Sequence, residues 1–320
     1  MIGWAALALS ALILTAAVAA PWAWPLPAGV AAPVVPADNP MSAAKVALGR
    51  RLFYDADLSI DGTMSCASCH EQKHAFADGN TTRPGVHGDA GRRNVPGLVN
   101  VAWLPVLTAA DPRVMTLEAQ AAIPIFGLTP VEMGMHGSDQ EIPRRLSQDA
   151  CYRRQFRNAF PERRGRIDMT AVAMALASFE RSMVAFDTPA DRDALSPDAS
   201  AGRAVFGRTC SSCHSGPNFT DGRFHAILPV NKTDGGLAEV TGRAEDEGRF
   251  RTPPLRNVAV TGPWFHDGSA RTLGDAIARH PITLDAADMD GLIAYLEALT
   301  DRGFISNPAF AYPDDPCGSK

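Results

Sequence analysis

The sequence "CASCH" at residues 66–70 returns almost unchanged as "CSSCH" at residues 210–214. Both copies have the C-x-x-C-H pattern of c-type haem attachment. The spacing suits that chemistry, because the two thiols bond to the porphyrin vinyl groups and the next residue then lies beneath the iron as its proximal histidine ligand. We therefore predict two covalently bound haems c, held by Cys66, Cys69 and His70 and by Cys210, Cys213 and His214.

Two other uses of such cysteine pairs fit the sequence less well. A redox-active C-x-x-C pair does not need a histidine after it, least of all twice. A zinc site would have to draw its ligands from both motifs, which lie far apart in the chain. The remaining cysteines, Cys151 and Cys317, belong to no motif. Cys317 lies in the polar tail "YPDDPCGSK", which we expect to be disordered.

Length and composition indicate a globular and mainly helical protein. The chain has 320 residues, which favours about two domains. Hydrophobic residues make up 46% and charged residues 20%, an ordinary globular composition. The net charge is -5 with no long run of one sign, which argues against nucleic acid as the main partner. Abundant alanine and only 7% aromatic residues favour helices over sheets.

A short internal repeat precedes both haem motifs. The sequence "GRRLF" at residues 49–53 leads towards the first motif and "GRAVF" at residues 202–206 towards the second, each within a helical pattern. Between them, residues 168–186 form a strongly amphipathic helical pattern. The repeat predicts an all-α fold of two cytochrome-c-like haem domains, residues 40–190 and 195–310, with short strands and long loops.

The chain begins with an apolar segment. It runs from Ile2 to Ala20 and contains Ala17-Val18-Ala19, a small-x-small cleavage pattern. The usual basic residues are missing before it, and the segment is nearly long enough to span a bilayer. Residues 1–25 are therefore predicted to be a secretory signal peptide or, alternatively, a retained N-terminal anchor. Either alternative places the rest of the protein outside the cytoplasm.

Further motifs show a resemblance to a known family. Besides the two haem motifs, these are "PVEMG" (130–134), "RTPPLRNVAVTGPWFHDGS" (251–269) and "TLGDAIARH" (272–280). Together they resemble the bacterial di-haem cytochrome c peroxidase and MauG superfamily over about residues 40–305. The blocks around them are most similar to the MbnH branch, the MauG-like enzymes of methanobactin-type operons. Members of that branch are encoded beside a copper-binding partner, MbnP.

The resemblance gives a role to an unusual histidine. Leu273, Ala276, Ile277 and His280 fall on one helical face, where a lone histidine is more often a core residue than a ligand. In the superfamily, the ninth residue of the segment starting at Thr272 is the sixth ligand of the second haem; peroxidases carry Met there and MauG carries Tyr. The resemblance therefore implies that His280 ligates that iron opposite His214, giving a low-spin centre that stores electrons. The rival ligand is His266, which the family pattern places beside the haem.

The first haem is then expected to react with peroxide. Cleavage of the O–O bond needs a group that moves a proton from the inner to the outer oxygen. By resemblance this group is Glu132 of "PVEMG", and Gln120 and Pro124 match the other residues of the distal pocket. In classical peroxidases a loop histidine blocks this haem until the second is reduced, and His87 stands in the matching loop. His74 is expected to be exposed or to contact a haem propionate.

Two further features follow from the same resemblance. A calcium site between the domains is implied by Asn94 and by the backbone carbonyls of Thr252 and Pro254, since oxygen ligands suit Ca²⁺. Relatives also carry a tryptophan that relays electron holes between the haems, but this chain has Ala109 at that position. Trp103 and Trp264 are the candidate replacements, and plain packing is the alternative for both.

These features predict a periplasmic di-haem c enzyme whose oxidant is hydrogen peroxide. By resemblance to MbnH, it would reach a high-valent state of the bis-Fe(IV) kind and oxidise a tryptophan of an MbnP-like copper-binding protein towards kynurenine. The alternative is a cytochrome c peroxidase that takes electrons from a small cytochrome c or cupredoxin. A third interpretation is a non-catalytic electron-transfer cytochrome, against which the distal motif argues. The protein meets a membrane only if its N-terminal segment is retained.

Overall fold

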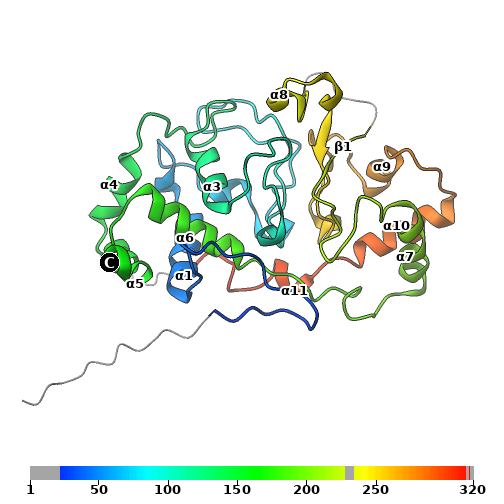
Figure 1. Cartoon of the computed structure of the whole chain (residues 1–320), viewed down its shortest axis with the longest axis horizontal. Coiled ribbons are helices and arrows are strands. Elements are labelled where there is room, and N and C mark those ends of the chain that lie inside the picture. Colours follow the sequence, from blue (N-terminus) through cyan, green and yellow to red (C-terminus); the bar gives the residue numbers. More distant parts are fainter. Residues whose placement is uncertain (1–21, 228–233, 315–316, 318–320) are drawn as a thin grey trace, which may run out of the picture.

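The computed structural model describes residues 22–227, 234–314 and 317. Residues 1–21 of the predicted leader therefore lie outside the described residues. The fold is mostly helical, as predicted, and it forms two lobes with a small sheet between them (Figure 1). None of the helices in the described ranges is both long and apolar enough to cross a membrane.

The first lobe holds helices α1 to α6 and the second holds α7, α9 and α10, while α8 lies beside the small sheet and α11 near the junction (Figure 1). The α-helices are α1 Ala43–Phe53, α2 Cys66–Cys69, α3 Leu117–Phe126, α4 Glu141–Gln148, α5 Ala150–Ala159, α6 Met169–Arg181, α7 Pro197–Thr209, α8 Ala238–Thr241, α9 Leu273–Ala278, α10 Ala286–Glu297 and α11 Arg302–Ile305. The 3₁₀ helices are Ala56–Leu58, Gln72–His74, Val101–Trp103, Pro161–Arg163, Ala244–Asp246 and Val258–Val260. Strands β1 (Phe224–Ala226) and β2 (Arg249–Arg251) form one antiparallel pair, with His225 opposite Phe250.

The repeated glycine brings two helices together in each lobe. A Cβ on Gly49 of α1 would lie 1.9 Å from the carbonyl oxygen of Ala175 in α6. A Cβ on Gly202 of α7 would lie 1.8 Å from the carbonyl oxygen of Gly291 in α10. Only glycine permits so close an approach, since real Cβ atoms are not found at such distances. The internal repeat thus corresponds to one helix crossing built twice.

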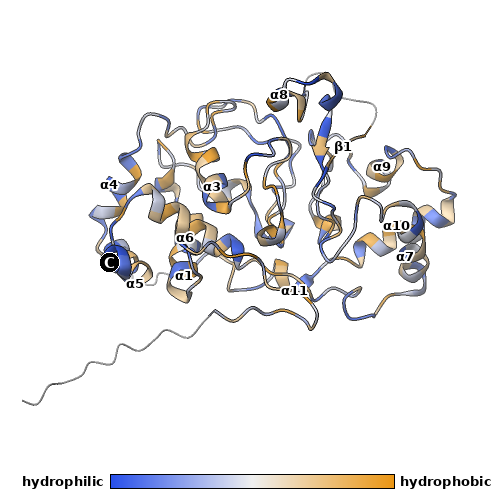
Figure 2. Cartoon of the chain, in the orientation of Figure 1, coloured by the Kyte–Doolittle hydropathy of each residue, from blue (hydrophilic) through white to orange (hydrophobic). Residues whose placement is uncertain are grey.

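The repeated phenylalanine fills the two cores. Phe53 packs edge-on against Phe179 of α6, with ring centroids 5.3 Å apart. Phe206 packs against Tyr295 of α10 at the same centroid distance, 5.3 Å. The two rings belong to separate clusters of buried hydrophobic residues, one in each lobe. In Figure 2, α3 and α6 are coloured largely as hydrophobic, whereas the outlying α4 and α5 carry hydrophilic stretches.

Helix α6 ends earlier than its amphipathic pattern predicts. The pattern continues to Phe186, but the helix stops at Arg181. The reason is Asn100, whose backbone N–H donates to the carbonyl of Met183. Its side chain also donates to the carbonyl of Ala185 at 3.0 Å and accepts from the N–H of Ala185 at 2.8 Å. These contacts hold residues 183–185 in a non-helical course.

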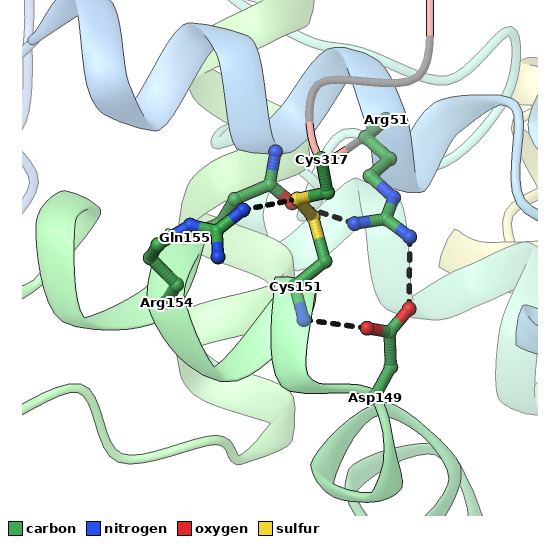
Figure 3. Close-up of a disulfide and its surroundings, with 6 residues drawn as sticks. All are labelled: Arg51, Asp149, Cys151, Arg154, Gln155 and Cys317. Carbon is green, nitrogen blue, oxygen red and sulfur yellow. Dashed lines mark hydrogen bonds and ion pairs between the residues drawn. A yellow bond between two sulfur atoms is a disulfide. The ribbon is translucent and has the colours of Figure 1, made fainter. Parts of the chain in front are cut away.

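The end of the chain returns to the first lobe. Phe304 and Phe310 belong to the first hydrophobic cluster, although they fall within the predicted second domain. A disulfide joins Cys151 of α5 to Cys317, and Arg154 donates a hydrogen bond to the Cys317 sulfur (Figure 3). The expectation of a disordered tail is therefore wrong at Cys317. Spacing alone did not reveal the pair, because its cysteines lie 166 residues apart.

Candidate functional site

The first haem motif presents a buried imidazole with one nitrogen occupied. Cys66 and Cys69 form the short helix α2, and the N–H of His70 caps it by donating to the carbonyl of Cys66. Nδ1 of His70 lies 2.6 Å from the carbonyl oxygen of Phe76, so Nδ1 carries the proton. Burial lowers the pKa of His70, which favours the neutral ring. Nε2 is then the nitrogen available to a metal, as in histidine ligands generally.

The second motif repeats this arrangement. Nδ1 of His214 lies 3.0 Å from the carbonyl oxygen of Phe219, and burial lowers the pKa of His214. Phe76 and Phe219 both have left-handed backbones, with φ of 64° and 55°. Such a conformation is rare for a bulky residue, and here it turns the carbonyl towards the histidine.

The four motif cysteines fit covalent attachment. All of Cys66, Cys69, Cys210 and Cys213 are free thiols, so neither motif closes on itself as a disulfide. Burial raises the pKa of Cys66 and of Cys210, and it raises that of Cys69 to about 11. Two free thiols followed by a histidine whose Nε2 can bind iron are the groups that covalent attachment of a haem c requires.

His280 lies near His214, at a separation that suits two ligands of one metal ion. Their ring centroids lie 6.4 Å apart. Two imidazoles on opposite sides of an ion, each with a bond of about 2 Å, place their centroids roughly 6 Å apart. Nδ1 of His280 lies 2.9 Å from the carbonyl oxygen of Ala276, so its Nε2 is the free nitrogen. The turn after α9 thus brings together two histidines far apart in sequence.

His266, the rival ligand, has a different environment. Its ring stacks on Phe250 of β2 at a centroid distance of 3.9 Å and an interplanar angle of 11°. Its backbone carbonyl accepts a hydrogen bond from the N–H of Asn94 at 2.7 Å, which links the two lobes. The buried Nε2 has no hydrogen-bond partner among the described residues.

The loop that carries Glu132 is fixed against α3. The N–H of Met133 donates to the carbonyl of Pro124 at 2.9 Å, and the N–H of Val86 donates to that of Glu132 at 2.7 Å. Gln120 and Pro124 are four residues apart on α3 and therefore share one face of that helix. Pro124 cannot donate to the carbonyl of Gln120, so the α3 hydrogen-bond ladder is interrupted there.

Glu132 lies within electrostatic range of the first haem motif. Its charge raises the pKa of both Cys66 and Cys69. The Glu132 side chain is solvent-accessible, yet enough protein surrounds it for desolvation to raise its own pKa. A carboxyl with a raised pKa beside the attachment cysteines is suited to holding and passing a proton.

Two other predicted histidines lie near these loops. His87 is exposed, and its Nε2 would be 3.2 Å from a Cβ on Gly134, two residues after Glu132. The loop of His87 thus lies against the loop of Glu132. His74 is partly buried rather than exposed, and its Nδ1 lies 3.1 Å from the carbonyl oxygen of Val260 in the second lobe.

Two of the predicted calcium ligands, Asn94 and Thr252, make hydrogen bonds within the protein. The Asn94 amide donates to the carbonyl of Asn80 at 2.7 Å. The carbonyl of Thr252 accepts from the Thr220 hydroxyl at 2.7 Å and from the Arg251 guanidinium at 3.2 Å. A carbonyl with both lone pairs occupied, one by a cation, does not fit a calcium ion. We derive no role for calcium from these residues or from Pro254.

The candidate relay aromatics occupy different places. Trp103 donates through Nε1 to the carbonyl of Ala31 at 2.9 Å and packs edge-on against Trp24 and Phe186. Trp264 instead packs on the second hydrophobic cluster and donates to the carbonyl of Val258 at 2.9 Å. The carbonyl of Ala109 accepts from the N–H of Arg251 in β2 at 2.8 Å, so this position lies where the lobes meet.

Sequence reasoning missed two buried charged residues near these sites. Glu180 of α6 is only 5% exposed, its charge raises the pKa of Cys66, and burial raises its own pKa to about 8. Arg251 is buried, which lowers its pKa to about 10, and within the described residues its guanidinium donates to the carbonyl groups of Thr108 and Thr252. A buried guanidinium with neutral partners is suited to an anion such as a haem propionate. Neither residue stands in a motif that signals its burial.

Comparison with known proteins agrees with this double site. The family model described as "Di-haem cytochrome c peroxidase" matches residues 43–200. The chain is 34% identical to the methylamine utilization protein MauG of Methylophilus methylotrophus, over 87% of this chain and 89% of that protein. The chain belongs to the di-haem cytochrome c peroxidase and MauG family. It is accordingly a haem-dependent oxidoreductase.

The relatives of this chain include both MauG proteins and cytochrome c peroxidases. It is 31% identical to the cytochrome c551 peroxidase of Pseudomonas aeruginosa, over 88% of this chain and 85% of that protein. Among solved structures, a "MauG-like protein associated with microbial copper homeostasis" superimposes with a TM-score of 0.88 at 35% identity. That match covers 91% of this chain and 99% of the other. Identity to MauG and to peroxidases is so similar that it does not decide between the two activities.

Proposed function

We propose that this family member is an exported di-haem c enzyme that uses hydrogen peroxide to oxidise a side chain of a partner protein. In this proposal the His70 site reacts with peroxide, and the His214 site supplies the second oxidising equivalent. The observation that carries it is the 6.4 Å separation of His214 and His280, which would let both histidines ligate one haem iron. A haem held by both would have no position left for peroxide and would serve in electron transfer.

The residues around the His70 site have complementary tasks. A haem c bound there supplies the iron at which peroxide is cleaved. The carbonyl of Phe76 fixes the tautomer and orientation of His70 through Nδ1. The Glu132 carboxylate takes a proton from the inner oxygen of peroxide and returns it to the outer one, so that water leaves. Gln120 and Pro124 shape the same face of the pocket from α3.

The partner we propose is a copper-binding protein of MbnP type, modified at a tryptophan towards kynurenine. This extends the sequence resemblance to the MbnH branch. Support comes from the MauG-like protein associated with copper homeostasis, because the match spans 99% of that chain and has a TM-score of 0.88. A substrate that is oxidised at a distance need not enter the haem pocket.

The Cys151–Cys317 disulfide supports export to the periplasm. Disulfides form and persist in oxidising compartments such as the periplasm and are rare in the cytosol. Attachment of haem c likewise uses thiols of the exported chain. We therefore propose that the described part of the protein works in the periplasm, whether the N-terminal segment is cleaved or retained.

The proposed function can be tested on the partner. The diferric protein is mixed with stoichiometric peroxide and an MbnP-like protein, and the partner is then examined by peptide mass mapping. We expect oxidation at a tryptophan with the wild-type enzyme and none with Glu132→Gln. The surface variant Glu245→Gln is the matched control and should behave as wild type. An unmodified partner, despite complete consumption of peroxide, would contradict the proposal.

The second candidate is a peroxidase that reduces peroxide with electrons from a small cytochrome or cupredoxin. It is favoured by the 31% identity to cytochrome c551 peroxidase and by the position of His87 against the Glu132 loop. Rapid oxidation of a reduced small cytochrome c by peroxide, seen only after one electron has entered the enzyme, would favour it.

A further inference from the structure

A line of aromatic rings runs from the junction of the lobes to the N-terminal segment. Trp22 and Trp24 pack edge-on with centroids 6.1 Å apart, and Trp24 packs on Trp103 at 6.2 Å. Trp103 in turn packs on Phe186 at 5.5 Å. Three of the five tryptophans of the chain therefore lie in one contiguous line. Trp22 and Trp24 are partly exposed, so the line reaches the surface.

The inner end of this line reaches the loop that holds His214. The Arg256 guanidinium lies between two rings, with its Cζ 4.4 Å from the centroid of Phe186 and 5.5 Å from that of Phe219. Phe219 is the residue whose carbonyl oxygen binds Nδ1 of His214 at 3.0 Å. Rings and guanidinium thus form an unbroken series of contacts from the proximal histidine to Trp22.

A chain of hydrogen bonds follows the same course. The backbone N–H of Trp103 donates to the carbonyl of Asn100 at 3.1 Å. The Asn100 amide donates to the side-chain oxygen of Asn218 at 2.9 Å, and both side chains are buried. Asn218 is the neighbour of Phe219 in sequence, so Trp103 is connected to the His214 loop by two routes.

The charge within the series is compensated. A positive guanidinium beside Phe186 would oppose an electron hole on the neighbouring tryptophan. Asp191 removes this obstacle, because its carboxylate accepts from both terminal nitrogens of Arg256 at 2.7 and 2.9 Å. Arg256 is almost fully buried, which keeps the pair undisturbed by solvent.

We propose that this series, from Phe219 through Arg256, Phe186 and Trp103 to Trp24 and Trp22, carries oxidising equivalents from the His214 site to the surface. Trp24 and Trp22 are the outermost members of the series, and their indole rings are far more easily oxidised than the phenyl ring of Phe186. Residues 22–24 follow the Ala17-Val18-Ala19 cleavage pattern and therefore stay in the protein after cleavage there, and they are the place where the substrate protein gives up its electrons. This inference rests on the proposed function, since it requires oxidation of the enzyme by peroxide.

The transfer balances as two one-electron steps. Each peroxide takes up two electrons and two protons and yields two molecules of water. The two electrons leave an oxidisable aromatic side chain of the partner one at a time, pass Trp24 and Trp103, and reduce the two sites of the enzyme. The partner side chain, now oxidised by two electrons, releases its protons to solvent.

The series can be tested without a partner. Diferric holoprotein is treated with repeated stoichiometric peroxide and no reductant, and oxidation at Trp22 and Trp24 is measured by peptide mass mapping. Phe186→Leu interrupts the series, and Trp103→Phe keeps a ring there that is hard to oxidise. Both variants should lower oxidation at Trp22 and Trp24 several-fold while the oxidised state still forms. Oxidation of Met115, which is 65% exposed, serves as the internal control for attack by free peroxide.

The outcomes separate the two proposals. The series is overturned if oxidation of Trp24 is unchanged in both variants, or if Trp24 is not oxidised in the wild type. The proposed function still stands in either case, provided that the oxidised state forms. If no oxidised state forms at all, both proposals fail. A merely structural clamp on the N-terminal segment would leave the tryptophan products unchanged in Phe186→Leu, because that variant keeps the hydrogen bond from Trp103 Nε1 to the carbonyl of Ala31. Tyr312→Phe, an exposed aromatic outside the series, is the matched control and should resemble the wild type.

Discussion

Substituting the repeated glycine of α7 with alanine should destabilise the second lobe. A Cβ at Gly202 would lie 1.8 Å from the carbonyl oxygen of Gly291 and 2.3 Å from its carbonyl carbon. Carbon atoms in contact prefer about 3.5 Å or more, so α7 and α10 would have to separate by more than about 1 Å. Backbone on both sides leaves no flexible side chain to give way.

Gly207→Ala, five residues later, provides a control that should raise stability and not lower it. Gly207 lies on the same helix, is exposed, and a Cβ there would meet nothing within 4 Å. Replacing a helical glycine by alanine adds about 0.5–1 kcal/mol of stability. Overpacking at Gly202 costs about 3 kcal/mol, which this gain only partly offsets. Gly202→Ala should thus be about 3 kcal/mol less stable than Gly207→Ala.

Denaturant unfolding of both holoproteins measures the difference. Far-UV circular dichroism reports the helices, and the absorption of the haem attached at Cys210 and Cys213 reports the second lobe, since α7 leads directly into Cys210. We expect Gly202→Ala to shift both transitions to lower denaturant and Gly207→Ala to shift neither downwards. Equal stability of the two variants would refute the helix crossing as described.

Three further predictions concern the candidate site and the tail. Burial raises the pKa of Glu132 above the ordinary 4.5 of a glutamate. As pH falls, the carboxylate that accepts the proton is therefore lost at a pH above 4.5, and the peroxide reaction should slow there. Glu132→Gln should be slow at every pH in stopped-flow measurements. His280→Ala should remove the low-spin EPR signal of one haem, and an unchanged spectrum would show that it is no ligand. The disulfide joins cysteines 166 residues apart, so replacing Cys151 and Cys317 with serine should lower the free energy of unfolding by about 2–5 kcal/mol. Denaturant unfolding measures this loss, and an unchanged stability would mean that the tail is held by other contacts.

Local patterns predicted the parts of the fold that depend on local chemistry. The two C-x-x-C-H motifs, the helices before them and the repeated Gly49 and Gly202 were all recognisable, because capping, periodicity and close packing leave short signals. The amphipathic helix at residues 168–186 was predicted too long, since its end is set by Asn100 from a distant part of the chain.

Features that need distant partners could not be predicted. Pairing of Cys151 with Cys317 depends on where the tail returns, which no spacing reveals. Burial of Glu180 and Arg251 depends on the tertiary packing around them, which their local sequence does not show. His280 lay between these cases, because its helical face was visible in the sequence, but its approach to His214 required the fold.

The assignment of one reactive and one electron-storing haem is tested most directly by adding stoichiometric peroxide to the diferric protein without reductant. Optical and EPR spectra are recorded together within the mixing time and afterwards. We predict a prompt loss of both ferric signals and a lasting oxidised state. Contradiction would be a protein whose spectra stay unchanged until one electron is supplied, which would indicate a gated peroxidase with His87 as the first candidate for the gate.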